Sequence, residues 1–270
     1  MINHVNVEKT AGDKKCAFLP FYKEGMVVEG AEWALSLRKA GSMRFRWNEQ
    51  NPLRDAFLSE VSDGKTVVPV ELNHTKIVLS VNEAEETHLK VADGIITQNT
   101  KLMPVVTVAD CVPIYFFDPV SRFFGIVHSG WKGTGIAGEA LRLAEKMYGA
   151  KLSDICVAIG PHIKNCCYVV DEKRAEYFAE NFSAECIESV KEGEKLCRGA
   201  SYNWNFGNGK LYRLSLEKAN LFVLKKAGIF EENIVCATDC TCCSEVFGSN
   251  RRETSSASSF TVQAAFVRVL

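Results

Sequence analysis

Residues 104–134 read PVVTVADCVPIYFFDPVSRFFGIVHSGWKGT, and this stretch decides the fold class. Two runs rich in β-branched and aromatic residues, 104–108 and 112–117, predict strands that are separated by a short polar break. Residues 118–121 (DPVS) predict a turn, because Asp and Pro favour the first positions of β-turns. Residues 122–127 predict the next strand. Because strands follow one another directly, a strict strand–helix alternation is excluded and we expect an α+β (mixed α/β) fold.

Further along the chain, the hydrophobic pattern predicts helices. Apolar residues repeat at helical spacing over 136–147, and Gly149 stands where a C-terminal cap is expected. A second amphipathic helix is predicted over 211–227, and Gly228 follows it. Asp171 can cap a further helix through its side-chain oxygen.

The remaining segments show weaker patterns. Strands are predicted at 75–81, 155–159, 234–237 and 260–270. We expect short strands or irregular structure over 15–48, a short helix over 55–61, and an irregular segment over 183–209. The chain has no internal repeat, low-complexity tract or long linker, so we expect a single domain over residues 1–270.

The composition excludes several classes of protein. The chain has 32 basic and 33 acidic side chains and a net charge of -1, so nucleic acid is not an expected partner. Hydrophobic residues make up 47%, which is too many for a disordered chain. The longest apolar runs, such as 112–117, are far shorter than the ~20 residues of a spanning helix, so no membrane partner is expected. Residues 1–14 are polar and mixed in charge, which predicts a cytoplasmic protein without a signal peptide.

The chain contains 11 cysteines, too few for a disulfide scaffold at this length. They predict a reducing compartment and thiols that are buried or bind metal. Five of them form two tight groups, Cys166-Cys167 and Cys240-Thr241-Cys242-Cys243. A zinc ribbon uses paired Cys-x₂-Cys knuckles, whereas consecutive cysteines from Cys236 to Cys243 are separated by 4, 2 and 1 positions. This spacing argues against a structural metal in these groups.

One cysteine and one histidine are expected to meet at the end of the predicted hairpin. If the strands around 118–121 pair antiparallel with Phe117 beside Arg122, then Cys111 lies beside His128. A thiolate and an imidazole are ligands of Zn²⁺, and they are also a nucleophile and its base. The alternative without a function is a buried cysteine beside an incidental histidine.

A third ligand would come from another histidine. His74 stands just before a predicted strand, and His162 follows a Gly-Pro pair that ends another. Spacing alone does not decide between these two. His4 and His88 lie in polar surroundings and are expected to be solvated.

The segment after His128 predicts an anion site. Gly130 and the glycines that follow it lead into a helix, and such loops present backbone N–H groups to anions. Lys132 could add a positive charge, and Arg251 and Arg252 could bind phosphate through bidentate hydrogen bonds. Without an anion, the glycines would simply form a tight strand-to-helix turn, and the two arginines would form a solvated basic turn.

Several motifs together resemble the laccase-domain family, which is also described as multicopper polyphenol oxidase-like, peptidoglycan editing factor or purine nucleoside phosphorylase. They are VADCVPI at 108–114, GIVHSGWKGT at 125–134 and GPHIKNCCY at 160–168. Further similar stretches are ADGIIT at 92–97, CTC at 240–242 and FGSNRR at 247–252. The resemblance spans about residues 30–270.

The resemblance implies a mononuclear site with His74, Cys111 and His128 as ligands. It implies a layered mixed β-sandwich flanked by helices. The implied activities are phosphorolysis of adenosine, inosine, guanosine or methylthioadenosine, and deamination of adenosine, with a small-molecule nucleoside and phosphate as partners. The candidate residues for binding substrate or phosphate are Arg38, Asn48, Gly130, Lys132 and Arg251.

Zinc is the expected cofactor, because two histidines and one cysteine with an open fourth position fit catalytic zinc. Copper is less expected, since a multicopper oxidase needs many histidines and the chain has five. Three alternatives remain open. They are a copper-dependent phenol oxidase, a metal-independent cysteine hydrolase that uses Cys111 and His128, for example on peptidoglycan precursors, and a non-catalytic metal-binding protein.

Overall fold

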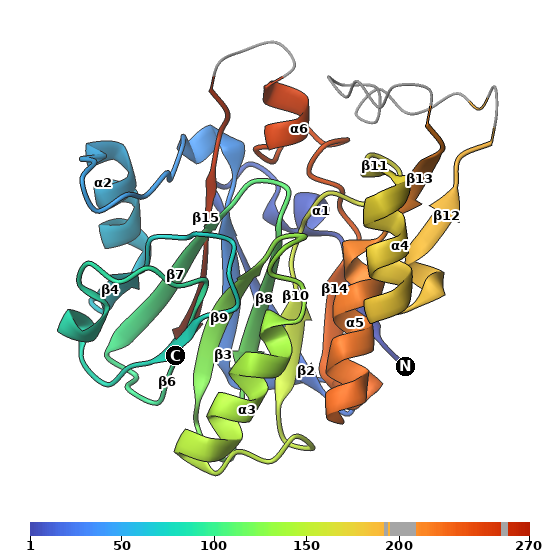
Figure 1. Cartoon of the computed structure of the whole chain (residues 1–270). Helices are drawn as coiled ribbons and strands as arrows, with labels where there is room; N and C mark the ends of the chain where they lie inside the picture. Colours follow the sequence, from blue (N-terminus) through green and yellow to red (C-terminus); the bar gives the residue numbers. More distant parts are fainter. Residues whose placement is uncertain (192–193, 195–208, 255–258) are drawn as a thin grey trace.

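The centre of the structure is a seven-stranded mixed sheet built around the predicted hairpin (Figure 1). This computed structural model describes residues 1–191, 194, 209–254 and 259–270. The strands of the sheet lie in the order β1 (Asn3–Val5), β14 (Ile234–Ala237), β10 (Cys156–Ile159), β8 (Val112–Phe117), β9 (Phe124–Ser129), β6 (Gly94–Thr97) and β5 (Val78–Ser80). The central strands are buried along their whole length, as expected for a sheet that is covered on both faces.

A five-stranded sheet packs against one face of the seven-stranded sheet. Its order is β2 (Cys16–Lys23), β3 (Met26–Ser36), β15 (Gln263–Val269), β7 (Leu102–Val108) and β4 (Thr66–Pro69). Large side chains from both sheets share one core. The rings of Trp33 and Tyr115 lie 5.2 Å apart, and those of Phe21 and Phe117 lie 5.8 Å apart. The two sheets therefore form a sandwich.

Helices flank both sides of the sandwich (Figure 1). On the outer face of the seven-stranded sheet lie α3 (Ile136–Tyr148) and α5 (Leu216–Ala227), with α4 (Glu172–Asn181) beside the small sheet of β11 (Val169–Asp171), β13 (Leu211–Leu214) and β12 (Ile187–Ser189). On the outer face of the five-stranded sheet lies α2 (Pro52–Val61). The shorter helices are α1 (Val7–Ala11) and α6 (Asn250–Glu253). This arrangement confirms the mixed α/β fold and the layered sandwich flanked by helices.

The register of the central hairpin differs from the prediction. Val112 pairs with Ser129 and Phe117 pairs with Phe124, which is two positions beyond the predicted partner of Phe117. The turn is longer than expected because Arg122 adopts a left-handed conformation with φ at 63°. Its N–H donates to the Asp118 carbonyl at 2.8 Å, which keeps Arg122 out of the strand. Cys111 and His128 nevertheless lie at the same end of the hairpin, because Cys111 directly precedes β8 and His128 is near the end of β9.

Three other predictions need correction. The segment 211–227 is not one helix: Leu211–Leu214 is a strand between β11 and β12, and the helix begins after Ser215, whose side chain accepts from the Lys218 N–H. The segment 15–48 holds two long strands, β2 and β3, rather than short ones. The strand predicted at 75–81 is only Val78–Ser80, because the backbone of Thr75 is bonded to a buried carboxylate instead of a neighbouring strand.

The predicted helix ends at Gly149 and Asp171 agree with the structure. The α3 helix ends at Gly149 in a left-handed cap, and Asp171 caps α4. The irregular segment predicted at 183–209 contains a short 3₁₀ turn at Ala184–Cys186 and the strand β12, and residues 192–193 and 195–208 of it lie outside the described residues. Over the described part of the chain, no helix has the length and apolar character required to cross a membrane.

Candidate functional site

Three side chains that could bind a metal meet at one end of the sandwich. The donor atoms of His74, Cys111 and His128 all lie within 4.8 Å of one another. The two imidazole rings have their centroids 4.9 Å apart and are nearly perpendicular at 84°. His162, the alternative third ligand, is not part of this group, and its Nδ1 lies 2.8 Å from the Gly160 carbonyl. The structure therefore brings together the set of three that the resemblance implies.

The three residues come from different segments that the sheet brings together. Cys111 immediately precedes β8, and His128 is the fifth residue of the neighbouring strand β9. His74 lies in the connection between β4 and β5 and adopts a left-handed conformation with φ at 55°. Such a conformation is strained for a residue with a side chain and needs support from its surroundings.

Asp93 provides that support and also orients His128. Its carboxylate is fully buried, and it accepts hydrogen bonds from the N–H groups of His74 at 2.9 Å and Thr75 at 2.6 Å. The Thr75 hydroxyl donates to it as well. His128 Nδ1 lies 3.1 Å from Asp93 Oδ1. Because a carboxylate can only accept, Nδ1 carries the proton and Nε2 is left as the donor atom for a metal.

Opposing effects set the pKa values of this group. Burial tends to raise the pKa of Cys111, but His128 and His74 outweigh it and lower this pKa to about 7. Burial tends to lower the pKa of His128, but Cys111 and Asp93 raise it to about 9. For Asp93, burial is outweighed by hydrogen bonds from His128 and Thr75, so its pKa lies below the ordinary value. The cysteine is therefore available as a thiolate near neutral pH, which suits both a metal ligand and a nucleophile.

Gly130 leaves the space that an ion would need. A Cβ added there would lie 3.0 Å from Cys111 Sγ, 3.2 Å from His74 Cδ2 and 3.7 Å from His128 Cε1. Any side chain at this position would therefore fill the space between the three donors. Two nitrogens and one sulfur, with a glycine beside them, fit a single metal ion.

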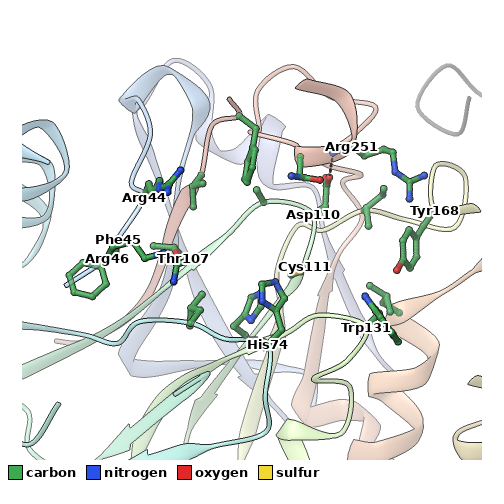
Figure 2. Close-up of a pocket in the computed structure, with 18 of the residues that line it drawn as sticks. Arg44, Phe45, Arg46, His74, Thr107, Asp110, Cys111, Trp131, Tyr168 and Arg251 are labelled. Carbon is green, nitrogen blue, oxygen red and sulfur yellow. Dashed lines mark hydrogen bonds between the residues drawn. The ribbon is translucent and has the colours of Figure 1, made fainter. Parts of the chain in front are cut away.

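The three donors open into a cavity of about 580 Å³, large enough for a nucleoside-sized molecule (Figure 2). In Figure 2, His74 and Cys111 lie at the centre, with Arg44, Phe45 and Arg46 on one side and Trp131, Tyr168 and Arg251 on the other. The walls contain four arginines and four aromatic residues, which are Arg44, Phe45, Arg46, Trp131, Tyr168, Arg174, Arg251 and Phe260. The cavity thus offers positive charge and flat apolar surfaces above the cluster.

The candidate residues for substrate binding lie in different places. Arg251 lines the cavity; its N–H donates to Asp110 at 2.6 Å, and its guanidinium donates to the Cys167 carbonyl at 3.2 Å. Arg38 lines a separate hollow and lies 3.4 Å from the Glu253 carboxylate. Lys132 is exposed, with its ammonium 5.4 Å from the centre of the Trp131 ring, and Asn48 is exposed in a turn. The structure therefore brings only Arg251 of these side chains to the cavity wall, and Gly130 lies beside the three donors.

The chain matches the family model of the multi-copper polyphenol oxidoreductase laccases over residues 50–265. The chain belongs to this laccase family. The matched range includes His74, Cys111, His128 and Arg251, and it begins after Arg38 and Asn48.

Several relatives of this chain are named purine nucleoside phosphorylase. One of them, YlmD from Geobacillus stearothermophilus, is 34% identical over 164 residues, which cover 60% of this chain and 55% of that protein. Another, from Clostridium acetobutylicum, is 30% identical over 197 residues, which cover 72% of this chain and 74% of that protein. The match spans little more than half the length of the YlmD proteins.

Solved structures of relatives share this fold. The crystal structure of YlmD from Geobacillus stearothermophilus aligns with a TM-score of 0.70 and 25% identity over 89% of this chain and 92% of that one. The hypothetical protein YfiH from Bacillus licheniformis aligns with a TM-score of 0.73 and 25% identity over 89% and 93%. The laccase-family chain thus has the mixed α/β fold of these proteins.

Several residues of the laccase-family site were not selected from the sequence. Asp93 lies in the ADGIIT stretch, and its position before a buried strand was the available signal. Arg44, Arg46 and Arg174 carried no signal, because isolated arginines in polar stretches are ordinary surface residues. Only the fold shows that they reach one cavity.

Replacing Asp93 with asparagine is expected to weaken metal binding by about 10–100-fold, because its amide cannot accept all the hydrogen bonds that the carboxylate accepts. Metal retention against a competing chelator measures the effect. Asp118→Asn is the matched control, since Asp118 is also fully buried and accepts local hydrogen bonds in the turn between β8 and β9. The control should lose stability but keep its metal. Equal metal retention by both variants would contradict an orienting role for Asp93.

Proposed function

We propose that this protein is a zinc-dependent purine nucleoside phosphorylase that also deaminates adenosine. The observation that carries the proposal is the position of His74, Cys111 and His128 within a cavity walled by arginines and aromatic rings. The purine nucleoside phosphorylases among its relatives support the choice of substrate class. Adenosine, inosine, guanosine and methylthioadenosine are the proposed nucleosides.

The donor set favours zinc over copper. Thiolate and imidazole ligands suit zinc, and an open fourth position is typical of catalytic zinc sites. When bound, the ion would supply Lewis acidity and lower the pKa of water towards neutrality. Among the described residues, the histidine-containing group that could bind a metal has only three donors, which is too few for several coppers.

The cavity walls suit the two parts of the substrates. Trp131 and Tyr168 line the cavity, and a purine that stacks on them would lie beside the guanidinium groups of Arg174 and Arg251, which are 4.3 and 5.4 Å from the centres of these two rings. Arg251 offers a guanidinium group to phosphate, whose charge lies between about -1 and -2 at neutral pH, and Arg44 and Arg46 could do so by exchanging their ion pairs with Glu49 and Glu71.

The proposed phosphorolysis replaces one bond at the ribose with another. A phosphate oxygen forms a bond to C1′ while the bond from C1′ to the purine nitrogen breaks. The purine leaves with the bonding electrons and takes up a proton, and ribose 1-phosphate is the second product. The proposed role of the arginines is to hold phosphate against C1′, and that of the aromatic rings is to hold the purine.

In the proposed deamination, water adds to C6 of adenine and ammonia leaves from the same carbon. The same three residues, His74, Cys111 and His128, serve this reaction. Asp93 keeps His128 Nδ1 protonated and so fixes the direction of its Nε2 atom. Deamination needs no phosphate, so the two reactions make different demands on the arginines.

A second candidate function rests on the same three residues. Cys111 with a lowered pKa, His128 with a raised pKa, and a carboxylate that orients the histidine are also the parts of a cysteine hydrolase. In that case Cys111 attacks the substrate directly and no metal is needed. Peptidoglycan precursors are one substrate class for such a hydrolase.

Cleavage of inosine in the presence and absence of phosphate tests the phosphorylase proposal. We expect hypoxanthine and ribose 1-phosphate to form only when phosphate is added, because phosphate is the nucleophile. Product analysis by chromatography distinguishes ribose 1-phosphate from free ribose. Adenosine deamination in the same samples is the control, since it should proceed without phosphate. Formation of free ribose at the same rate without phosphate would identify a hydrolase and refute the proposal.

A further inference from the structure

Four cysteine sulfurs meet outside the site described above. The Sγ atoms of Cys166, Cys167, Cys240 and Cys243, here called the four-cysteine cluster, all lie within 4.8 Å of one another. Cys243 Sγ lies 3.3 Å from Cys167 Sγ and 3.7 Å from Cys166 Sγ, and the last two lie 3.8 Å apart. These separations are much longer than a disulfide bond of about 2.05 Å. The cluster is thus an arrangement of four thiols.

The sheet topology explains why the cysteines meet. Cys166 and Cys167 lie in the loop after β10, and Cys240 and Cys243 lie in the loop after β14. These strands are parallel neighbours, so both loops leave the sheet at the same edge (Figure 1). A backbone bridge between His162 and Cys240 and a hydrogen bond from the Thr241 N–H to the His162 carbonyl join the loops.

The geometry points to a single metal ion. In a tetrahedral site with Zn–S bonds of about 2.3 Å, neighbouring sulfurs lie about 3.8 Å apart, close to two of the three separations given above, while the Cys167–Cys243 separation of 3.3 Å is shorter. Two of the ligands, Cys240 and Cys243, also have the Cys-x₂-Cys spacing of a zinc knuckle. We propose that the four-cysteine cluster binds a structural zinc ion, separate from the metal of the His74–Cys111–His128 site.

The backbone around Cys240 supports a metal-bound thiolate. The Lys164 N–H donates to Cys240 Sγ at 3.4 Å, and the N–H groups of Cys243 and Ser244 donate to the Cys240 carbonyl at 3.2 and 3.0 Å. These bonds fix the knuckle turn before any ion binds. The loop that supplies Cys240 and Cys243 is thus held by its own backbone hydrogen bonds.

Arginines lie beside both cysteine loops, and two of them, Arg213 and Arg252, are also paired with Glu194 and Glu253. A zinc ion with four thiolates has a net charge of -2, which is costly beside a protein core unless cations are near. Arg213 donates to the Cys166 carbonyl at 3.3 Å, Arg251 to the Cys167 carbonyl at 3.2 Å, and Arg252 to the Cys242 carbonyl at 3.3 Å. The guanidinium groups thus contact the backbone of both cysteine loops.

An ion can reach the site, and it would connect segments that line the cavity. Cys167 is fully buried, whereas Cys243 is exposed, so one side of the cluster faces solvent. Binding exchanges the protons of the thiols for one Zn²⁺, so it strengthens as pH rises. The ion would join the loop that carries Tyr168 to the loop of Thr241, whose hydroxyl donates to Asp110 beside Cys111 at 2.6 Å.

Metal analysis of the full-length protein, purified with zinc under reducing conditions, tests the proposal. Wild-type protein should contain about two zinc ions per chain, one for each set of donors. The Cys166→Ser/Cys243→Ser double variant and the Cys111→Ser variant should each contain about one. In cobalt-substituted protein, most of the thiolate-to-cobalt charge-transfer absorption should disappear in the double variant and remain in Cys111→Ser, since four thiolates absorb more strongly than one.

Cys242→Ser is the matched control, because Cys242 lies in the same loop but outside the cluster. It should retain both ions, and loss of one ion in this variant would overturn the set of four ligands. Wild-type protein with about one zinc ion, none of it left after Cys111→Ser, would overturn the second site and leave the proposed function intact. The opposite pattern, with zinc lost only in the double variant, would contradict the active-site metal instead.

Discussion

Replacing Cys111 with serine is expected to remove the metal from the His74–Cys111–His128 site and to abolish phosphorolysis and deamination together. Serine is a poor zinc ligand because its hydroxyl stays protonated at neutral pH, whereas the pKa of Cys111 is lowered to about 7. A catalytic metal contributes several kcal/mol, so kcat/KM should fall on the order of 10³-fold or more. Metal content and kcat/KM for inosine and adenosine measure the effect. Cys186→Ser, a buried thiol away from both metal-binding groups, is the control and should retain full activity.

Chelation separates this explanation from a nucleophilic role for Cys111. If Cys111 is a ligand, a chelator should abolish activity in wild-type protein and added zinc should restore it. If Cys111 is a nucleophile, the Cys166→Ser/Cys243→Ser variant, which lacks the proposed structural zinc, should keep its activity in chelator, and a thiol alkylator should inactivate the enzyme through an adduct at Cys111. Inactivation by alkylation combined with full activity in chelator would refute the metal-dependent function. It would favour the cysteine hydrolase, in which Asp93 and His128 activate the thiol.

The central hairpin shows how far the sequence could predict the site. The predicted register was wrong by two positions, because the left-handed conformation of Arg122 cannot be read from a run of apolar residues. Cys111 and His128 were still expected to be close, because both stand at the same end of two strands joined by a short turn. The prediction was derived from an exact pairing that is wrong by two positions, but a shift of two positions still leaves both residues at the same end of the hairpin.

Contacts between segments that are distant in the sequence could not be predicted from it. Spacing could not choose between His74 and His162, because the choice depends on where the loop after β4 is held by Asp93. Arg44 and Arg46 line the cavity because the fold brings the connection between β3 and α2, in which they lie, to the cavity wall. Periodicity describes neighbours within one element, whereas these contacts depend on how separate elements pack.

The cysteine groups illustrate the same limit. Counting consecutive separations in the second group argued against a metal knuckle, although Cys240 and Cys243 are separated by two residues. The other two cysteines lie more than 70 positions earlier and become neighbours only through the parallel pairing of β10 with β14. A metal site shared between two loops is therefore invisible to a search for motifs within one segment.

Gly130→Ala is expected to weaken metal binding without removing any donor. The added Cβ would lie 3.0 Å from Cys111 Sγ and 3.2 Å from His74 Cδ2, so it would occupy the space between the ligands. Displaced ligands should lower the affinity for zinc by about 100-fold, at the upper end of the effects of groups that support metal ligands, and kcat/KM should fall with it. Competition with a chelator of known affinity measures the first quantity, and steady-state kinetics at limiting zinc measures the second.

Gly138→Ala is the matched control for this prediction. It adds the same methyl group in the first turns of α3, where a Cβ would meet only Val223 at an ordinary contact distance of 3.4 Å. Alanine there should raise the free energy of unfolding by about 0.4–1 kcal/mol and leave zinc affinity unchanged. If Gly130→Ala binds zinc as tightly as wild-type protein, an ion does not occupy the space between the three donors. If it keeps its zinc but loses only phosphorolysis, the space beside Gly130 serves phosphate, as the glycine loop suggested from the sequence.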